Sequence, residues 1–159
     1  MRELLPLAER AATLLKARNE TIAIAESSAG GLITAALLAV PGASAYCLGG
    51  SVIYTAKAWK ALRDFKPELL GGHRSATEEN ALIRARLIRE RYGASWGLGE
   101  TGATGPTPNR YGDAPGHACI AVSGRIDHVV TIETGSKDRV GNMHSFAAAA
   151  LKLLAERIV

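Results

Sequence analysis

The sequence has few of the residues that metal sites, disulfide frameworks and aromatic nucleic-acid platforms require. Its 159 residues include two cysteines, four histidines and 5% aromatic residues. Cys47 and Cys119 are isolated within apolar runs, which predicts buried free thiols of a reduced compartment. The histidines are widely separated, and no Cys-x-x-Cys or His-Glu-x-x-His motif is present. We therefore expect no metal ion and no cofactor.

Long apolar runs are also missing, and no signal peptide is expected in residues 1–16. No segment approaches the length of a membrane span. Residues 1–16 alternate charge with leucine at helical spacing, unlike the apolar core of a signal peptide. We expect a cytoplasmic protein without membrane contact. With 47% hydrophobic and 21% charged residues, the chain is expected to form one globular domain over residues 1–159.

The excess of positive charge is modest, with a formal net charge of +4. Its densest stretch contains four arginines, Arg84, Arg86, Arg89 and Arg91. Their spacing distributes the side chains over a broad helix face, and no aromatic residues alternate with them as stacking platforms. We predict a solvent-exposed helix surface here, with a nucleic-acid-binding patch as the alternative.

Apolar periodicity predicts alternating helices and strands. Helical spacing indicates helices over residues 2–18, 32–40, 57–63 and 77–92, and a last helix that begins at Asp138 or Asn142. Apolar β-rich runs indicate strands over residues 21–25, 46–55 and 95–100, then a hairpin of 117–122 and 128–133. Residues 64–75 and 101–116 are predicted loops. This order predicts an α/β fold, a three-layer α/β/α sandwich with a mixed, mostly parallel sheet.

Polar, glycine-rich segments follow three predicted strands, at residues 26–31, 54–55 and 100–106. In such sheets, ligands bind beyond the carboxyl ends of the strands. The first segment runs into a helix, whose amides and dipole favour an anion, and Gly30 and Gly31 permit close approach. We predict that this turn binds a phosphate-bearing small molecule. A strand–helix turn capped by serine is the alternative.

Ser44, Tyr54, Lys57 and Lys60 are candidates for a nucleophilic site if the fold brings them together. A lysine amine whose pKa is lowered by burial can activate a serine hydroxyl, with a tyrosine relaying or stabilising the proton. The alternative is that Ser44 is an ordinary turn residue ahead of the second strand.

Five motifs, taken in order, resemble the C-terminal domain of the CinA family: AESSAGG (25–31), PGASA (41–45), GGSVIYT (49–55), TGATGP (101–106) and GHACIAV (116–122). The resemblance covers nearly the whole chain and implies a three-layer α/β/α sandwich. It also implies an amidohydrolase of NAD metabolism that cleaves nicotinamide mononucleotide to nicotinic acid mononucleotide and ammonia. A DNA-binding role tied to competence is a further alternative, for which the sequence offers little support.

The resemblance also implies roles for individual residues. Ser44 would be the nucleophile, with Tyr54 beside it and a lysine as base. Homo-oligomers are expected, because the family tends to self-associate. The residues implied to bind the phosphorylated nucleotide are Ser27, Ser28, Gly30, Gly31, Thr101, Gly102, Gly105 and Arg139.

The chain departs from the family pattern at this proposed site. Trp59 occupies the position of the family's lysine, so Lys60 or Lys57 would have to serve as base. Gly141 aligns with an expected arginine, for which Arg139 is the nearest substitute. In addition, residues 28–29 are Ser-Ala instead of Cys-Thr, and TPNR (107–110) replaces a Gly-Gly pair. These differences indicate a divergent branch: an amidohydrolase with a shifted base, or a catalytically inactive nucleotide-binding homologue.

Overall fold

A computed structural model of the protein describes residues 1–62 and 65–158. At its centre is a five-stranded sheet with the order β2-β1-β3-β4-β5. The strands are β1 (Ile22–Glu26), β2 (Cys47–Val52), β3 (Trp96–Ala103), β4 (His117–Ser123) and β5 (His128–Glu133). β1 pairs in parallel with β2 and β3, whereas β4 is antiparallel to β3 and β5. The predicted mixed sheet is confirmed, with β4 running against the other strands.

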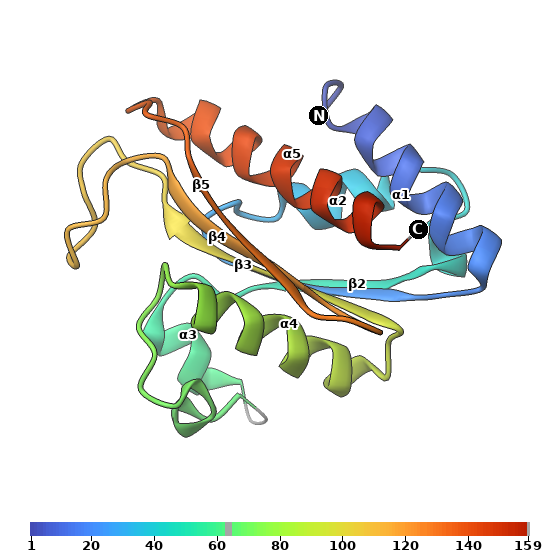
Figure 1. Ribbon diagram of the computed structural model, residues 1–159, viewed down its shortest axis with the longest axis horizontal. Helices are drawn as coiled ribbons and strands as arrows, with labels where there is room; N and C mark the ends of the chain where they lie inside the picture. Colours follow the sequence, from blue (N-terminus) through green and yellow to red (C-terminus); the bar gives the residue numbers. More distant parts are fainter. Residues whose placement is uncertain (63–64, 159) are drawn as a thin grey trace.

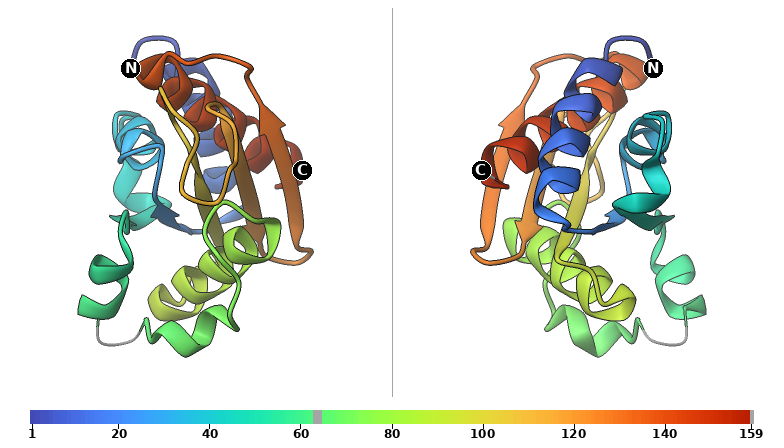
Figure 2. Two further views of the ribbon diagram at one scale, coloured as in Figure 1. Left: turned by 90° about the vertical axis from the view of Figure 1, so that its left-hand side faces the viewer. Right: turned by 90° about the vertical axis from the view of Figure 1, so that its right-hand side faces the viewer.

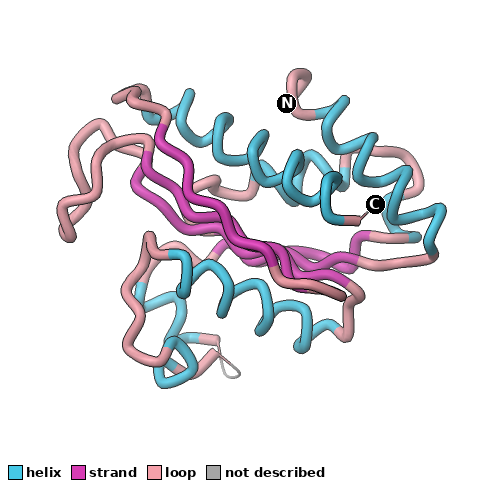
Figure 3. Tube along the Cα trace, viewed as in Figure 1, coloured by secondary structure: helices cyan, strands magenta, loops and turns pink. Residues whose placement is uncertain are grey.

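Helices cover both faces of the sheet (Figures 1 and 3). One face carries α1 (Leu5–Arg18), α2 (Leu32–Leu38) and α5 (Arg139–Arg157), and the other carries α3 (Ala56–Ala61) and α4 (Glu78–Tyr92). Short 3-10 helices span Ala43–Ala45 and Pro67–Leu70. The larger hydrophobic core lies between the sheet and helices α1, α2 and α5, and includes Leu15, Ile24 and Phe146. This arrangement confirms the predicted three-layer sandwich.

Several element boundaries differ from those expected from the sequence. α5 begins after Asp138, whose side chain accepts a hydrogen bond from the Val140 amide, so the first of the two predicted starts is right. β3 continues to Ala103 because residues 101–103 pair with β4, and the predicted loop therefore begins later. The helix predicted over 57–63 is Ala56–Ala61. Residue 63, and residue 64 of the following predicted loop, lie outside the described residues.

Two further expectations concern burial and membranes. Cys47 and Cys119 are buried and unpaired, as predicted. Within residues 1–62 and 65–158, no helix combines the length and apolar character needed to cross a membrane.

Close backbone packing fixes α4 on the sheet. A Cβ added at Gly97 would lie 1.9 Å from the Ala85 carbonyl oxygen, and one at Gly99 would lie 2.1 Å from that of Ala81. Only glycine permits such an approach of a helix to a strand. Residues 81–85 of α4 are thereby held against the amino-terminal half of β3.

Candidate functional site

A cavity of about 490 Å³ lies beyond the carboxyl ends of β1, β2 and β3. Its volume is within the range typical of small-molecule sites. Ser27 follows β1, Tyr54 and Thr55 follow β2, and Thr101 and Gly102 belong to the end of β3. Figure 2 (left) looks onto this end of the sheet, where the loop of residues 104–116 extends toward α4. The cavity therefore occupies the position at which such sheets bind ligands.

The turn of residues 26–31 is organised by Glu26, which is fully buried. Its carboxylate accepts hydrogen bonds from the amides of Gly31 (2.9 Å), Ile33 (3.1 Å) and Thr34 (2.7 Å), and from the Thr34 hydroxyl (2.5 Å). The chain's own carboxylate thus satisfies the free amides at the start of α2.

A second fully buried carboxylate, Glu100, reaches the same turn from β3. It accepts hydrogen bonds from the amides of Ser27 and Ala29, each at 2.9 Å, and from the Ser28 hydroxyl. Burial raises the pKa of Glu100; these three hydrogen bonds oppose the rise, and the nearby Glu26 charge adds to it.

Protein carboxylates bond the amides of Ser27, Ala29 and Gly31 in this turn, so these three amides are not open to a phosphate. The Ser28 hydroxyl is likewise engaged by Glu100. Phosphate binding by the turn stays a prediction. Gly30 and Gly31 do not line the cavity, and a Cβ at Gly30 would meet the Met143 side chain at 2.6 Å. Ser27 is the residue of the turn that lines the cavity.

The structure does not bring Ser44 together with Tyr54, Lys57 and Lys60. Ser44 is an exposed residue of the 3-10 helix before β2, whereas Tyr54 follows the end of β2. Six strand residues separate these two ends, roughly 20 Å of extended chain. In Figure 1, β2 enters the sheet at the right and leaves it toward α3 at the left. Within a single chain, therefore, Ser44 does not lie beside Tyr54, Lys57 and Lys60 as the nucleophilic site would require.

Of the two candidate lysines, Lys60 lines the cavity and Lys57 does not. Both belong to α3, and both are exposed. The buried residue between them is Trp59, whose ring also lines the cavity. Lys60 is one residue after Trp59, which occupies the position of the family's lysine. Lys60 nevertheless lines the cavity.

Arg139 connects two other predicted site residues at the sheet edge. Its guanidinium donates hydrogen bonds to the Gly105 carbonyl (2.6 Å) and to the Tyr54 hydroxyl (2.9 Å). Arg139 and Gly105 are outside the cavity lining, whereas Tyr54 is part of it. Arg139 is thus placed to orient Tyr54.

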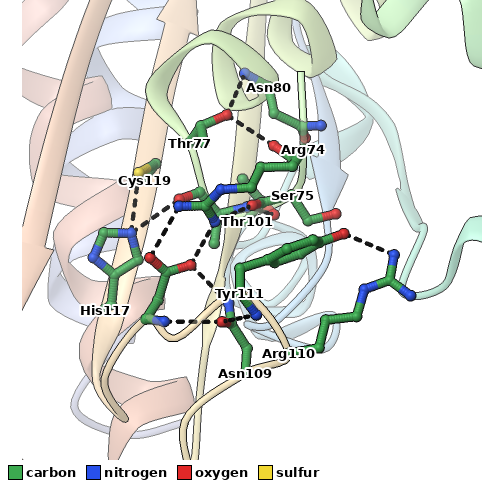
Figure 4. Close-up of polar contacts among 12 residues, drawn as sticks. Arg74, Ser75, Thr77, Asn80, Thr101, Asn109, Arg110, Tyr111, His117 and Cys119 are labelled. Carbon is green, nitrogen blue, oxygen red and sulfur yellow. Dashed lines mark hydrogen bonds and ion pairs between the residues drawn. The ribbon is translucent and has the colours of Figure 1, made fainter. Parts of the chain in front are cut away.

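The loop of residues 104–116 covers the cavity from one side. Arg74 forms a two-pronged ion pair with Asp113, with N–O distances of 2.6 and 3.1 Å. The Arg74 guanidinium lowers the pKa of Asp113. Figure 4 shows the Tyr111 ring beneath Arg74, with its hydroxyl directed toward Arg110. Both guanidinium carbons lie 4.9 Å from the centre of that ring.

Thr101 is held by the segment that precedes α4. Its hydroxyl accepts a hydrogen bond from the Ala76 amide at 3.0 Å. The Ala76 carbonyl in turn lies 3.0 Å from Nε2 of His117, whose Nδ1 pairs with Glu133. Thr101 and His117 are labelled in Figure 4. Thr101 therefore lies at a fixed point of the cavity wall, as expected of a pocket residue.

Arg84 is a cavity residue that the sequence assigned to the solvent. It is only 4% exposed, in contrast to the predicted solvated surface formed by the four arginines of α4. The buried positions Ala81, Ala85 and Ile88 lie on the same helix face, and their spacing is the sequence signal that could have revealed it.

Positive charge dominates the cavity wall. Among its described lining residues there is no carboxylate, whereas four cationic side chains contribute, those of Lys60, Arg74, Arg84 and Arg110. Arg74 is paired with Asp113, which lies outside the lining. Cationic walls with low-dielectric surroundings concentrate anions. The arrangement is suited to a small anionic ligand.

Comparisons with known sequences agree with this architecture. The family model for the CinA C-terminal domain matches residues 4–158. A CinA-like protein from Acidobacterium capsulatum is 34% identical over 145 residues, which cover 91% of this chain and 35% of that protein. A CinA-like protein from Anaeromyxobacter sp. (strain K) is 35% identical over 153 residues, covering 95% and 38%. The chain spans little more than a third of the length of these relatives.

Solved structures share the fold. A CinA-superfamily protein from Klebsiella pneumoniae has a TM-score of 0.89 at 24% identity, covering 98% of this chain and 97% of that chain. The competence/damage-inducible protein CihA from Agrobacterium tumefaciens has a TM-score of 0.84 at 26% identity, covering 96% and 94%. With the family model matching nearly every residue, the chain belongs to the CinA C-terminal domain family.

Proposed function

We propose that this protein binds a phosphorylated nucleotide amide, such as nicotinamide mononucleotide, in the cavity beyond β1, β2 and β3, without hydrolysing it. The observation that carries the proposal is the charge of the cavity wall, where four cationic side chains line a space of about 490 Å³ and one of them, Arg74, is paired with Asp113. No carboxylate is among the described lining residues. A phosphate monoester carries about −1.5 to −2 charges at neutral pH and complements such a wall. The remote position of Ser44 is the reason for proposing binding without turnover.

Amide hydrolysis in the same cavity is the second candidate, and the position of Lys60 favours it. A hydroxyl from the cavity wall, such as that of Ser27, would attack the carboxamide carbon while the lysine amine accepts its proton. The lysine would return that proton to the amide nitrogen as the C–N bond breaks, so that ammonia leaves. Water would then hydrolyse the ester to the serine and release the nicotinic acid product. In this version Ser44 has no part in the chemistry.

Binding and ammonia release, measured on the same preparations, separate the two candidates. We expect calorimetry to detect nicotinamide mononucleotide binding to the wild type and, unchanged, to Ser44→Ala. Lys60→Ala should weaken binding by up to about fivefold, because an exposed charge pair contributes up to about 1 kcal/mol. No ammonia should be released.

Each alternative result has a definite meaning. Ammonia release that depends on Lys60 and not on Ser44 would establish the second candidate. Release that disappears in Ser44→Ala would contradict both, and absence of binding to the folded wild type would overturn the first.

A further inference from the structure

Arg84 is an unusual cavity residue, because its charge is buried without a directly bound carboxylate. It lies in the second turn of α4, where its Nε donates to the Asn80 side-chain oxygen at 2.7 Å. Its Nη1 donates to the Ile53 carbonyl at 3.1 Å, and its guanidinium carbon lies 4.9 Å from the centre of the Trp59 ring. These contacts hold the guanidinium in one orientation without neutralising its charge.

The remaining nitrogen of Arg84, Nη2, has no hydrogen-bond partner in the described part of the chain, although Arg84 lines the cavity. The carboxylate that acts electrostatically on Arg84 is Glu100, which is committed to the turn after β1. Burial lowers the pKa of Arg84 to about 10, so the side chain is still charged at neutral pH. An uncompensated buried charge is strongly unfavourable, and an anion in the cavity would compensate it.

We propose that Arg84 binds the phosphate monoester of the ligand through Nη2, at the cavity wall next to Trp59. This inference rests on the proposed nucleotide binding and identifies the part of the ligand that Arg84 recognises. A planar, fixed guanidinium is the side chain best suited to phosphate oxygens. In contrast to Nη2 of Arg84, the amides of Ser27, Ala29 and Gly31 in the turn of residues 26–31 are bonded to carboxylates.

Arg84 could instead serve only to join α4 to Trp59 and Ile53, and ligand binding separates these roles. The ligands are nicotinamide mononucleotide and nicotinamide riboside, which lacks the phosphate. The variants are Arg84→Met, Arg84→Lys and the control Arg86→Met, which removes an exposed arginine of the same helix that pairs with Asp127. Both affinities are measured for each protein by calorimetry.

We expect the wild type and Arg86→Met to prefer the mononucleotide. The preference should fall by about 10- to 100-fold in Arg84→Met, as for the loss of a charged hydrogen bond. Arg84→Lys should retain part of it, and the affinity for the riboside should not change. The same preference in Arg84→Met as in the wild type would overturn the proposal.

Inorganic phosphate provides a test that does not depend on nucleotide binding. It should raise the Tm of the wild type and of Arg86→Met but not that of Arg84→Met. Only the phosphate-induced rise is compared, because Arg84→Met also removes the donor to the Asn80 and Ile53 oxygens and so changes the Tm without ligand. Should Arg84→Met fail to fold, the comparison is made with Arg84→Lys, in which the phosphate-induced rise should be reduced.

The outcomes separate the two proposals. A phosphate effect that requires Arg84, without mononucleotide binding, would retain the anion site and refute the proposed ligand. A phosphate effect of equal size in all variants would refute the role of Arg84, whatever the ligand.

Discussion

Replacing Glu100 with alanine is expected to lower the free energy of unfolding by about 3 kcal/mol or more. The substitution leaves the buried amides of Ser27 and Ala29 without their acceptor, at about 1–3 kcal/mol each, and also leaves a cavity. Glu100→Gln is the matched control, since its side-chain oxygen can still accept from the two amides. Urea denaturation of both variants measures the difference. Equal stability of the alanine variant and the wild type would contradict the role assigned to Glu100.

The same residue predicts a pH effect of definite sign. Because burial raises the pKa of Glu100, the folded state retains a proton that the unfolded chain has already released. The stabilisation from this proton is full below the unfolded-state pKa and is lost as pH rises through the folded-state pKa. As pH rises above the unfolded-state pKa of a glutamic acid, about 4.3, Glu100→Gln should therefore gain stability relative to the wild type until the folded-state pKa has been passed. A constant difference over that range would contradict the raised pKa.

Gly99→Ala is expected to have the second large effect, a loss of about 3 kcal/mol or more. Its new Cβ would lie 2.1 Å from the Ala81 carbonyl oxygen and 2.6 Å from the Ala85 amide nitrogen, so α4 would have to move off the sheet. Arg84 would move with the helix, and binding of nicotinamide mononucleotide should weaken as well.

Gly141→Ala is the control for this substitution. A Cβ there meets the carboxylate of Asp138, the cap of α5, at 2.6 Å, but alanine is favoured over glycine in a helix, so the two effects oppose each other. Its stability should change by less than about 1 kcal/mol. Denaturant unfolding of the two variants tests the contrast, and equal effects would show that the contact between α4 and β3 is not tight.

The order of helices and strands could be predicted because it follows from local patterns of apolar and capping residues. Apolar spacing identified the α/β alternation, and Asp138 marked the start of α5 through its capping side chain. The cavity's position also followed from the sequence, since polar segments at Tyr54 and Thr101 end strands that proved to be neighbours of β1.

The chemistry of the site was harder to predict because it depends on contacts between distant residues. Glu100 reaches Ser27 across 73 positions, and no local pattern indicates that its carboxylate takes the amides of the turn. Ser44 was grouped with Tyr54 because they are close in sequence, but the extended strand between them separates their side chains. The spacing of the four arginines predicts solvent exposure for Arg84, although its position beside Ala81 and Ala85 places it on the buried face of the helix.

A crystal structure of the protein with nicotinamide mononucleotide bound is the most direct test of where the ligand binds. We expect the nucleotide in the cavity lined by Tyr54, Lys60 and Thr101, with a phosphate oxygen within hydrogen-bond distance of Nη2 of Arg84. A phosphate bound by the amides of residues 26–31, or a nicotinamide beside Ser44, would contradict it.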